Sequence, residues 1–172
     1  MRVRRRLLAL PIAVLLSAGL VAPATATGTG WEPVPDEPDD TVAACGTTLT
    51  VHEKVNDVET RTVPLGNGAT RTDYRGKYVV SVSAPDGRKV VLDNSGPYSV
   101  TEYASGDLFV DIGAPSLIYY LDAIEKAAFA RAGLPPAFYY RSGRLKLSIG
   151  DGREKVVARP KNVTSICSLL RR

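Results

Sequence analysis

Side chains that commonly carry catalysis are scarce in this chain of 172 residues. His52 is the only histidine, and Thr50 and Lys54 place it on the polar side of an alternating segment. Serine and cysteine hydrolases usually activate the nucleophile with a nearby base, most often histidine. No Gly-x-Ser-x-Gly motif nominates a serine. We therefore expect His52 to lie on the surface of a strand, and the sequence names no catalytic residue.

The residue types of a metal or cofactor site are also missing in any recognised spacing. One histidine and two cysteines do not make a usual zinc ligand set. Neither the spacing of an EF-hand nor a glycine-rich phosphate-binding loop occurs. We therefore expect no metal and no cofactor.

Carboxylates remain as candidates for acid–base chemistry. Asp107 and Asp111 flank a short apolar segment, and Asp93 and Glu102 lie in or near neighbouring turns. Glycoside hydrolysis needs two carboxyl groups roughly 5 to 10 Å apart. Such pairs also arise by chance in an acid-bearing β domain, so a histidine-independent carboxylate hydrolase is kept only as an alternative.

The two cysteines, Cys45 and Cys167, bracket nearly all of the sequence that is able to fold. Neither belongs to a Cys-x-x-Cys motif. In an exported chain an even pair is most simply a disulfide. Closing so long a loop would stabilise the fold by about 4–5 kcal/mol in the chain-entropy model, which is an upper figure.

Residues 1–26 have the features of a cleaved signal peptide. Arginines precede an apolar stretch over 7–21, and Ala24 and Ala26 fit a small-x-small cleavage site. The apolar stretch is shorter than the roughly 20 residues of a spanning helix. We expect a secreted, extracellular protein with no membrane insertion after cleavage; Arg4 and Arg5 leave the twin-arginine route open beside the general secretory one.

Cleavage would change the charge of the chain. The full sequence carries 22 basic and 18 acidic residues, a formal net charge of +4, and four of the arginines lie before the cleavage site. The cleaved chain would therefore be neutral overall, so the basic precursor is no evidence for a nucleic-acid partner. Residues 27–44 are acidic, proline-rich and poor in apolar side chains, which predicts a disordered linker before one domain over 45–172.

Alternating apolar residues and regular turns follow Cys45. We expect strands at 48–55 and 58–63 with Asn56-Asp57 as their turn, and a hairpin of 138–140 with 144–149. A helix is expected over 122–132, while 116–121 fits either a helix or a buried strand. If Tyr139 and Tyr140 lie in a strand, one ring packs inside and the other reaches the surface. Further strands are expected at 77–84, 88–93, 98–103, 108–112 and 154–159.

The turns and the C-terminal segment resemble those of uncharacterised exported proteins of actinobacteria. The matching pieces are Asp86-Gly87, Asn94-Ser95-Gly96-Pro97, Ser105-Gly106-Asp107, Gly133-Leu134-Pro135, Ser142-Gly143-Arg144, Asp151-Gly152 and Ile166-Cys167-Ser168-Leu169-Leu170. The resemblance implies secretion and a β domain. It implies no activity and no functional residue.

The sequence thus predicts a mainly β domain, an antiparallel sandwich or barrel-like sheet with one short helix after a disordered N-terminal segment. The expected function is a non-catalytic extracellular binding or interaction module whose partner is an extracellular protein or a small ligand. Three alternatives stay open: a small-molecule carrier in a β barrel, a secreted protease inhibitor and the carboxylate hydrolase. An inhibitor would present an exposed loop at 93–98 or 113–116.

Overall fold

A computed structural model describes residues 30–119 and 123–171 of the chain. The expected signal peptide lies outside these ranges. The described residues form antiparallel sheets and two short helices, which confirms a mainly β fold. Neither helix is long and apolar enough to cross a membrane.

The elements are β1 (Glu32–Pro33), β2 (Asp40–Ala44), β3 (Thr47–Gly66), β4 (Ala69–Ser83), β5 (Lys89–Asp93), β6 (Tyr98–Glu102), β7 (Leu108–Gly113), β8 (Ser116–Tyr119), α1 (Ala123–Arg131), β9 (Ala137–Ser142), β10 (Arg144–Gly150), β11 (Arg153–Ala158), β12 (Lys161–Ser165) and α2 (Ile166–Leu169).

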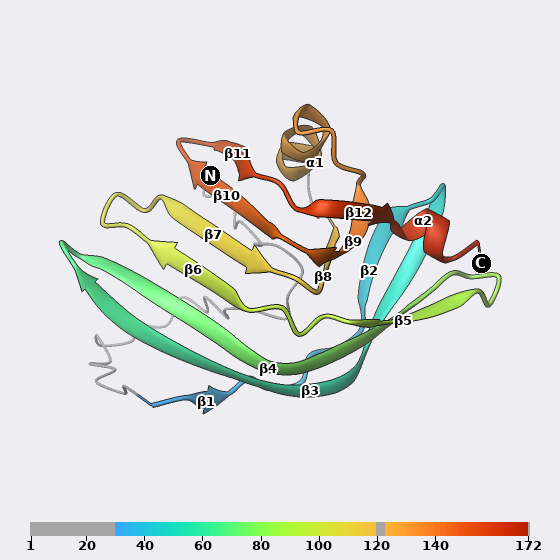
Figure 1. Cartoon of the computed structure of the whole chain (residues 1–172), viewed down its shortest axis with the longest axis horizontal. Helices are drawn as coiled ribbons and strands as arrows, with labels where there is room; N and C mark the ends of the chain where they lie inside the picture. The colour runs from blue at the N-terminus through green and yellow to red at the C-terminus, as the bar shows by residue number, and fades with distance from the viewer. Residues whose placement is uncertain (1–29, 120–122, 172) are drawn as a thin grey trace.

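The long hairpin of β3 and β4 joins the two halves of a nine-stranded sheet (Figure 1). At its open end, β2 pairs with β3 and β5 pairs with β4. Toward its tip, β4 instead pairs with β6, and the sheet continues through β7 and β10 to β11. The ribbon pair curves along its length, so that the two halves enclose a common space.

One β-bulge explains why the sequence pattern of β3 is misleading. The register against β4 shifts between Glu53 and Val55, so Lys54 is an extra residue. Leu49 and Val51 point to the core before the bulge, and Val58 does so after it. The alternation of inward and outward side chains changes phase here, because a bulge places two residues of one strand opposite a single residue of its partner. The prediction of two strands divided by a turn at 56–57 is therefore wrong, since Asn56 and Asp57 continue a single strand.

A second sheet, ordered β12-β9-β8, fills the space between the halves. One of its faces, with Leu117 and Tyr139, packs on the half that contains β2 and β5. Its other face, with Ile118 and Tyr140, packs on β7 and β10. Both faces are buried, so all four residues of β8 are buried, and Leu117, Ile118 and Tyr119 follow one another without polar alternation. Residues 116–119 are thus strand, whereas 120–122 lie outside the described residues.

The prediction that one of Tyr139 and Tyr140 reaches the surface is wrong for the same reason. Their relative exposures are 6% and 0%. The predicted hairpin of 138–140 with 144–149 is also wrong, because β9 pairs with β8 and β12 while β10 pairs with β7 and β11. The chain changes sheets at Gly143. The expected helix is present as α1, and α2 is an additional short one.

The expectation of a disordered linker extending to residue 44 is wrong for its described part. β1 and β2 both pair with β3, and Val42 and Ala44 enter the core. We call residues 31–40 the strap, since they run along the edge of β3 between these pairings. Backbone pairing and two small apolar residues order a segment whose acidic composition favours disorder. Trp31 lies outside the core and is only partly exposed.

Candidate functional site

His52 is on the surface of β3, as expected, and contacts the strap. Its Nδ1 lies 2.6 Å from Oδ1 of Asp39, and both side chains are about half exposed. Ser81 faces His52 across the ladder, but its relative exposure is only 2%. A substrate cannot reach that hydroxyl, so the Asp39–His52 pair is not completed to a triad.

A group of carboxylates and phenols joins the strap to the inner face of the sheet. The Tyr78 hydroxyl donates to Oε1 of Glu53 at 2.8 Å, and the Tyr119 hydroxyl donates to Oδ2 of Asp40 at 2.9 Å. Burial, followed by these neighbouring carboxylates, raises the pKa of both tyrosines. The phenols therefore stay protonated and act as donors. Tyr119 holds Asp40 of the strap directly, whereas Tyr78 holds Glu53 of β3, whose Oε2 accepts the N–H of Glu37 in the strap at 3.2 Å.

The carboxylates that the sequence nominated for hydrolysis are engaged in local contacts. Asp111 is 2.6 Å from Nε of Arg144 and 3.4 Å from Nζ of Lys146. Asp107 accepts the hydroxyl of Ser105 at 2.9 Å, and Asp93 accepts the N–H of Ser95 at 3.0 Å. These are contacts within turns and surface ion pairs. They do not direct two carboxyl groups toward a common point, as glycoside hydrolysis needs.

Glu102 ends β6 at an exposed position. Within residues 30–119 and 123–171, no three acidic, histidine or cysteine side chains are grouped so as to hold a metal ion.

The loops nominated for protease inhibition pack on each other instead of projecting. Gly96 N–H donates to the Pro115 carbonyl at 2.9 Å, and Gly113 N–H donates to that of Pro97 at 2.7 Å. Asn94 is buried and accepts the N–H of Leu117 at 2.6 Å. The space inside the folded sheet is filled as well, by Phe138, Tyr140, Leu145 and Leu147 at 0% exposure.

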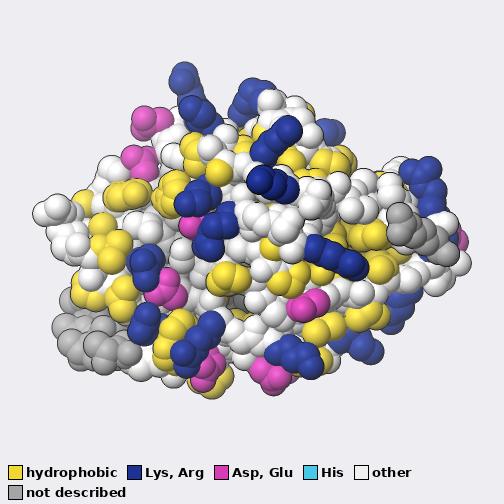
Figure 2. All heavy atoms as spheres, in the orientation of Figure 1, with side chains coloured by type: hydrophobic (Ala, Val, Ile, Leu, Met, Phe, Trp, Pro, Cys, Tyr) yellow, Lys and Arg dark blue, Asp and Glu magenta, His cyan; other side chains and the backbone are white. Residues whose placement is uncertain are grey.

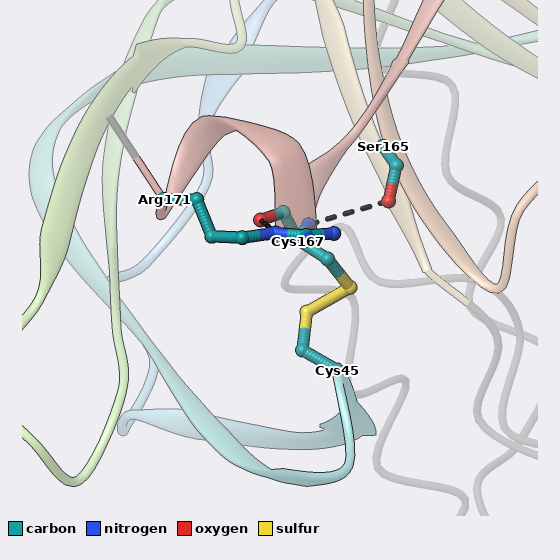
Figure 3. Close-up of a disulfide and its surroundings, with 4 residues drawn as sticks. All are labelled: Cys45, Ser165, Cys167 and Arg171. Atoms are coloured by element: carbon teal, nitrogen blue, oxygen red, sulfur yellow. Dashed lines mark hydrogen bonds between the residues drawn. A yellow bond between two sulfur atoms is a disulfide. The ribbon is translucent and has the colours of Figure 1, made fainter.

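The disulfide between Cys45 and Cys167 is present, as predicted, and joins residues 122 positions apart. Such a bond is typical of an oxidising, extracellular environment. In Figure 3 the side chain of Arg171 lies beside Cys167, and its Nε donates to the Cys167 carbonyl at 3.1 Å. The Ser165 hydroxyl accepts the N–H of Cys167, which caps α2.

A cavity of about 440 Å³ adjoins this disulfide. Leu49, Ala84 and Leu170 contribute apolar side chains to it, and Arg88 and Arg171 contribute guanidinium groups. Asp86 already pairs with Arg88. Of the two arginines that line the cavity, Arg88 is therefore already neutralised by a carboxylate.

A second hollow, of about 770 Å³, lies between α1 and β11. Ala123, Ile124, Ala127 and Val156 contribute apolar side chains to its lining. Arg131 of α1 and Arg153 and Lys155 of β11 contribute basic ones. Figure 2 shows basic side chains outnumbering acidic ones on the upper part of the molecule, over α1, β10 and β11. The basic residues from 123 to 171 are Lys126, Arg131, Arg141, Arg144, Lys146, Arg153, Lys155, Arg159, Lys161 and Arg171, against Glu125, Asp151 and Glu154.

No family model matches the chain, and no curated protein or solved structure is significantly similar to it.

Sequence reasoning missed the basic surface of the C-terminal part. The overall charge balance concealed it, because the acids of the strap cancel the bases of β10, β11 and α1 in the total. In the structure, the strap lies along β3 instead. The excess of basic over acidic residues in the C-terminal part of the sequence is what indicates this surface.

Proposed function

We propose that this chain is an exported, non-catalytic interaction module that binds an acidic partner outside the cytoplasm. The observation that carries the proposal is the basic surface over α1 and β11, since the bases of β10, Arg144 and Lys146, share Asp111 as an ion-pair partner. Two of the three acids in that part, Glu125 and Glu154, are 3% and 5% exposed, so they contribute little to the surface. An acidic partner would be attracted to this surface and oriented by it.

Export is part of the proposal. The basic and apolar regions and the small-x-small site of residues 1–26 have the order of a signal peptide. The Cys45–Cys167 disulfide is consistent with an oxidising destination. We also propose kinship with exported actinobacterial proteins, on the turns quoted above.

The contacts of the other candidates favour binding over the alternatives. The Ser81 hydroxyl opposite His52 is buried, and Asp111 pairs with two bases. The loops of an inhibitor would have to project, but Gly96 and Gly113 are bonded to the opposite loop. A barrel carrier would need the interior that β8 and β9 occupy.

Titration of the purified chain with poly-L-glutamate tests this function. We expect saturable binding that weakens as salt rises, because screening acts on exposed charges. The double variant Arg153→Gln/Lys155→Gln should weaken it, whereas the matched pair Lys77→Gln/Lys89→Gln, at exposed positions of β4 and β5, should not. Equal loss in both pairs would contradict the proposal. So would turnover of a substrate that one polar substitution abolishes without unfolding the chain.

A further inference from the structure

Helix α1 has its polar and apolar residues on unexpected sides. It buries Glu125, at 3% exposure, together with Ala128 and Phe129. Its large aliphatic side chain, Ile124, is 47% exposed, and Ala127 is exposed as well. A surface helix ordinarily turns its apolar stripe to the core and its charges to water. The outer face of α1 therefore has the composition of a contact surface.

The neighbouring strand β11 turns this face into a groove. Val156 and Gly152 line the opposite wall of the cavity of about 770 Å³. Alanine side chains on α1 allow the backbone of a second helix to approach closely. At 1.5 Å per residue, the nine residues of α1 span about 13 Å, which accommodates two to three helical turns of a ligand.

The free edge of β11 is not open to an added strand. Arg131 on α1 donates through Nη2 to the Glu154 carbonyl at 3.0 Å. Arg159, beyond β11, donates to the Ala132 carbonyl at 3.1 Å, which holds the two elements together. Since α1 packs against β11 and Arg131 occupies the Glu154 carbonyl, we expect recognition here to be of the helix-in-groove kind and not strand addition.

The rim of the groove specifies the charge of its ligand. Arg131, Arg153 and Lys155 line it, and Arg153 and Lys155 have no ion-pair partner among the described residues. Glu154 also lines the groove but is 5% exposed. A second copy of this chain would bring the same bases face to face, because a two-fold interface is self-complementary. Charge complementarity therefore favours an acidic ligand from another protein.

We infer that the groove between α1 and β11 binds an amphipathic helix of a partner protein, with apolar residues toward Ala127 and acidic residues toward Arg153 and Lys155. This inference rests on the proposed function and adds the place and the class of ligand. The groove is small, so the complex should be transient, with a dissociation constant in the micromolar range.

Two synthetic peptides of identical composition test the inference. One is made of Leu, Ala and Glu with leucines at i, i+3, i+4 and i+7, and the other is its scrambled form. The variant Ala127→Gln extends a polar side chain into the groove, and Ala130→Gln makes the same change at an exposed position of α1 outside the groove lining. Binding is followed by fluorescence anisotropy of labelled peptide, and circular dichroism verifies that both variants fold.

We expect the patterned peptide to bind and the scrambled one to bind at least about tenfold more weakly, with Ala127→Gln losing a similar factor. Ala130→Gln should stay within about twofold of the unmodified chain. Equal binding of both peptides, or full binding by Ala127→Gln, would overturn the groove while leaving the proposed function intact. Failure of both peptides and of poly-L-glutamate would overturn both. Binding to vesicles of anionic lipid but not to the peptide would replace the helix with a membrane surface.

Discussion

The guanidinium carbon of Arg75 lies 3.9 Å from the centre of the Trp31 ring. Arg61 lies over the same ring at 4.7 Å, and Glu59 accepts from Nη2 of Arg75 at 2.9 Å. Trp31 belongs to the strap, whereas the two arginines belong to β3 and β4. Cation–π contacts of this kind contribute about 0.5–2 kcal/mol each, depending on desolvation. They fix the start of the strap to the sheet.

Replacing Arg75 should loosen the strap before it affects the rest of the fold. Trp31 is the only tryptophan, so its fluorescence reports on the start of the strap. We expect Arg75→Ala to increase acrylamide quenching of Trp31. Arg88→Ala removes an exposed arginine that pairs with Asp86, and it should leave quenching unchanged. Unchanged quenching in Arg75→Ala would show that the strap is held without this contact.

Stability should fall steeply above pH 10. The pKa values of Tyr78, Tyr98, Tyr119 and Tyr140 are all raised from 10.0, in each case first by burial. The folded state keeps these protons while the unfolded state loses them. The free energy of unfolding therefore drops by about 1.4 kcal/mol per pH unit for each tyrosine, and no such loss occurs below pH 10.

Urea unfolding at pH 8, 10, 10.5 and 11 measures this slope. Tyr98→Phe should make the slope shallower, because one of the buried titrating phenols is gone. Tyr103→Phe, at a side chain that is 47% exposed, should leave the slope unchanged. A flat profile between pH 10 and 11 would contradict the raised pKa values of these buried phenols.

Loss of the disulfide should destabilise the fold strongly. Cys45→Ser/Cys167→Ser frees a loop with a sequence separation of 122 residues, so we expect a loss of up to about 4–5 kcal/mol. Urea unfolding of this variant should match that of the reduced unmodified chain. If reduction leaves the urea midpoint where it was, the bond contributes nothing to stability.

Gly96→Ala should destabilise the contact between the two loops. A Cβ at this position would lie 2.6 Å from Oγ of Ser116 and 2.7 Å from the Pro115 carbonyl oxygen, and would overlap the Gly113 carbonyl. Overpacking against backbone costs about 1–3 kcal/mol or more. Gly30→Ala meets no atom within 4 Å and serves as the matched control. Equal thermal midpoints for the two variants would refute the close approach.

Local patterns predicted most of the strands, the helix α1 and the disulfide. Alternation over 144–149 is a direct consequence of one buried and one more exposed face. The pattern failed where that assumption failed. At β8 and β9 both faces are buried, and at Lys54 a single extra residue changes the phase of the alternation.

Partner choice between strands was harder to predict than their existence. The turn at Gly143 looks like that of a hairpin, yet it takes the chain from one sheet to the other, because distant strands compete for the same edges. The ordering of the strap had the same origin. Pairing with β3 supplied hydrogen bonds that its own acidic, proline-rich composition does not reveal.

The strands that are synthesised early depend on residues synthesised later to bury their apolar side chains. The long β3–β4 hairpin emerges early, but the apolar side chains of β8 and β9 that cover its inner face come from 117–119 and 137–139. Until those residues leave the ribosome, the early strands expose their inner faces to any chaperone or aggregation partner. A nascent chain arrested before Ala137 should therefore be held unfolded, and burial of the hairpin becomes an event of the final third of translation.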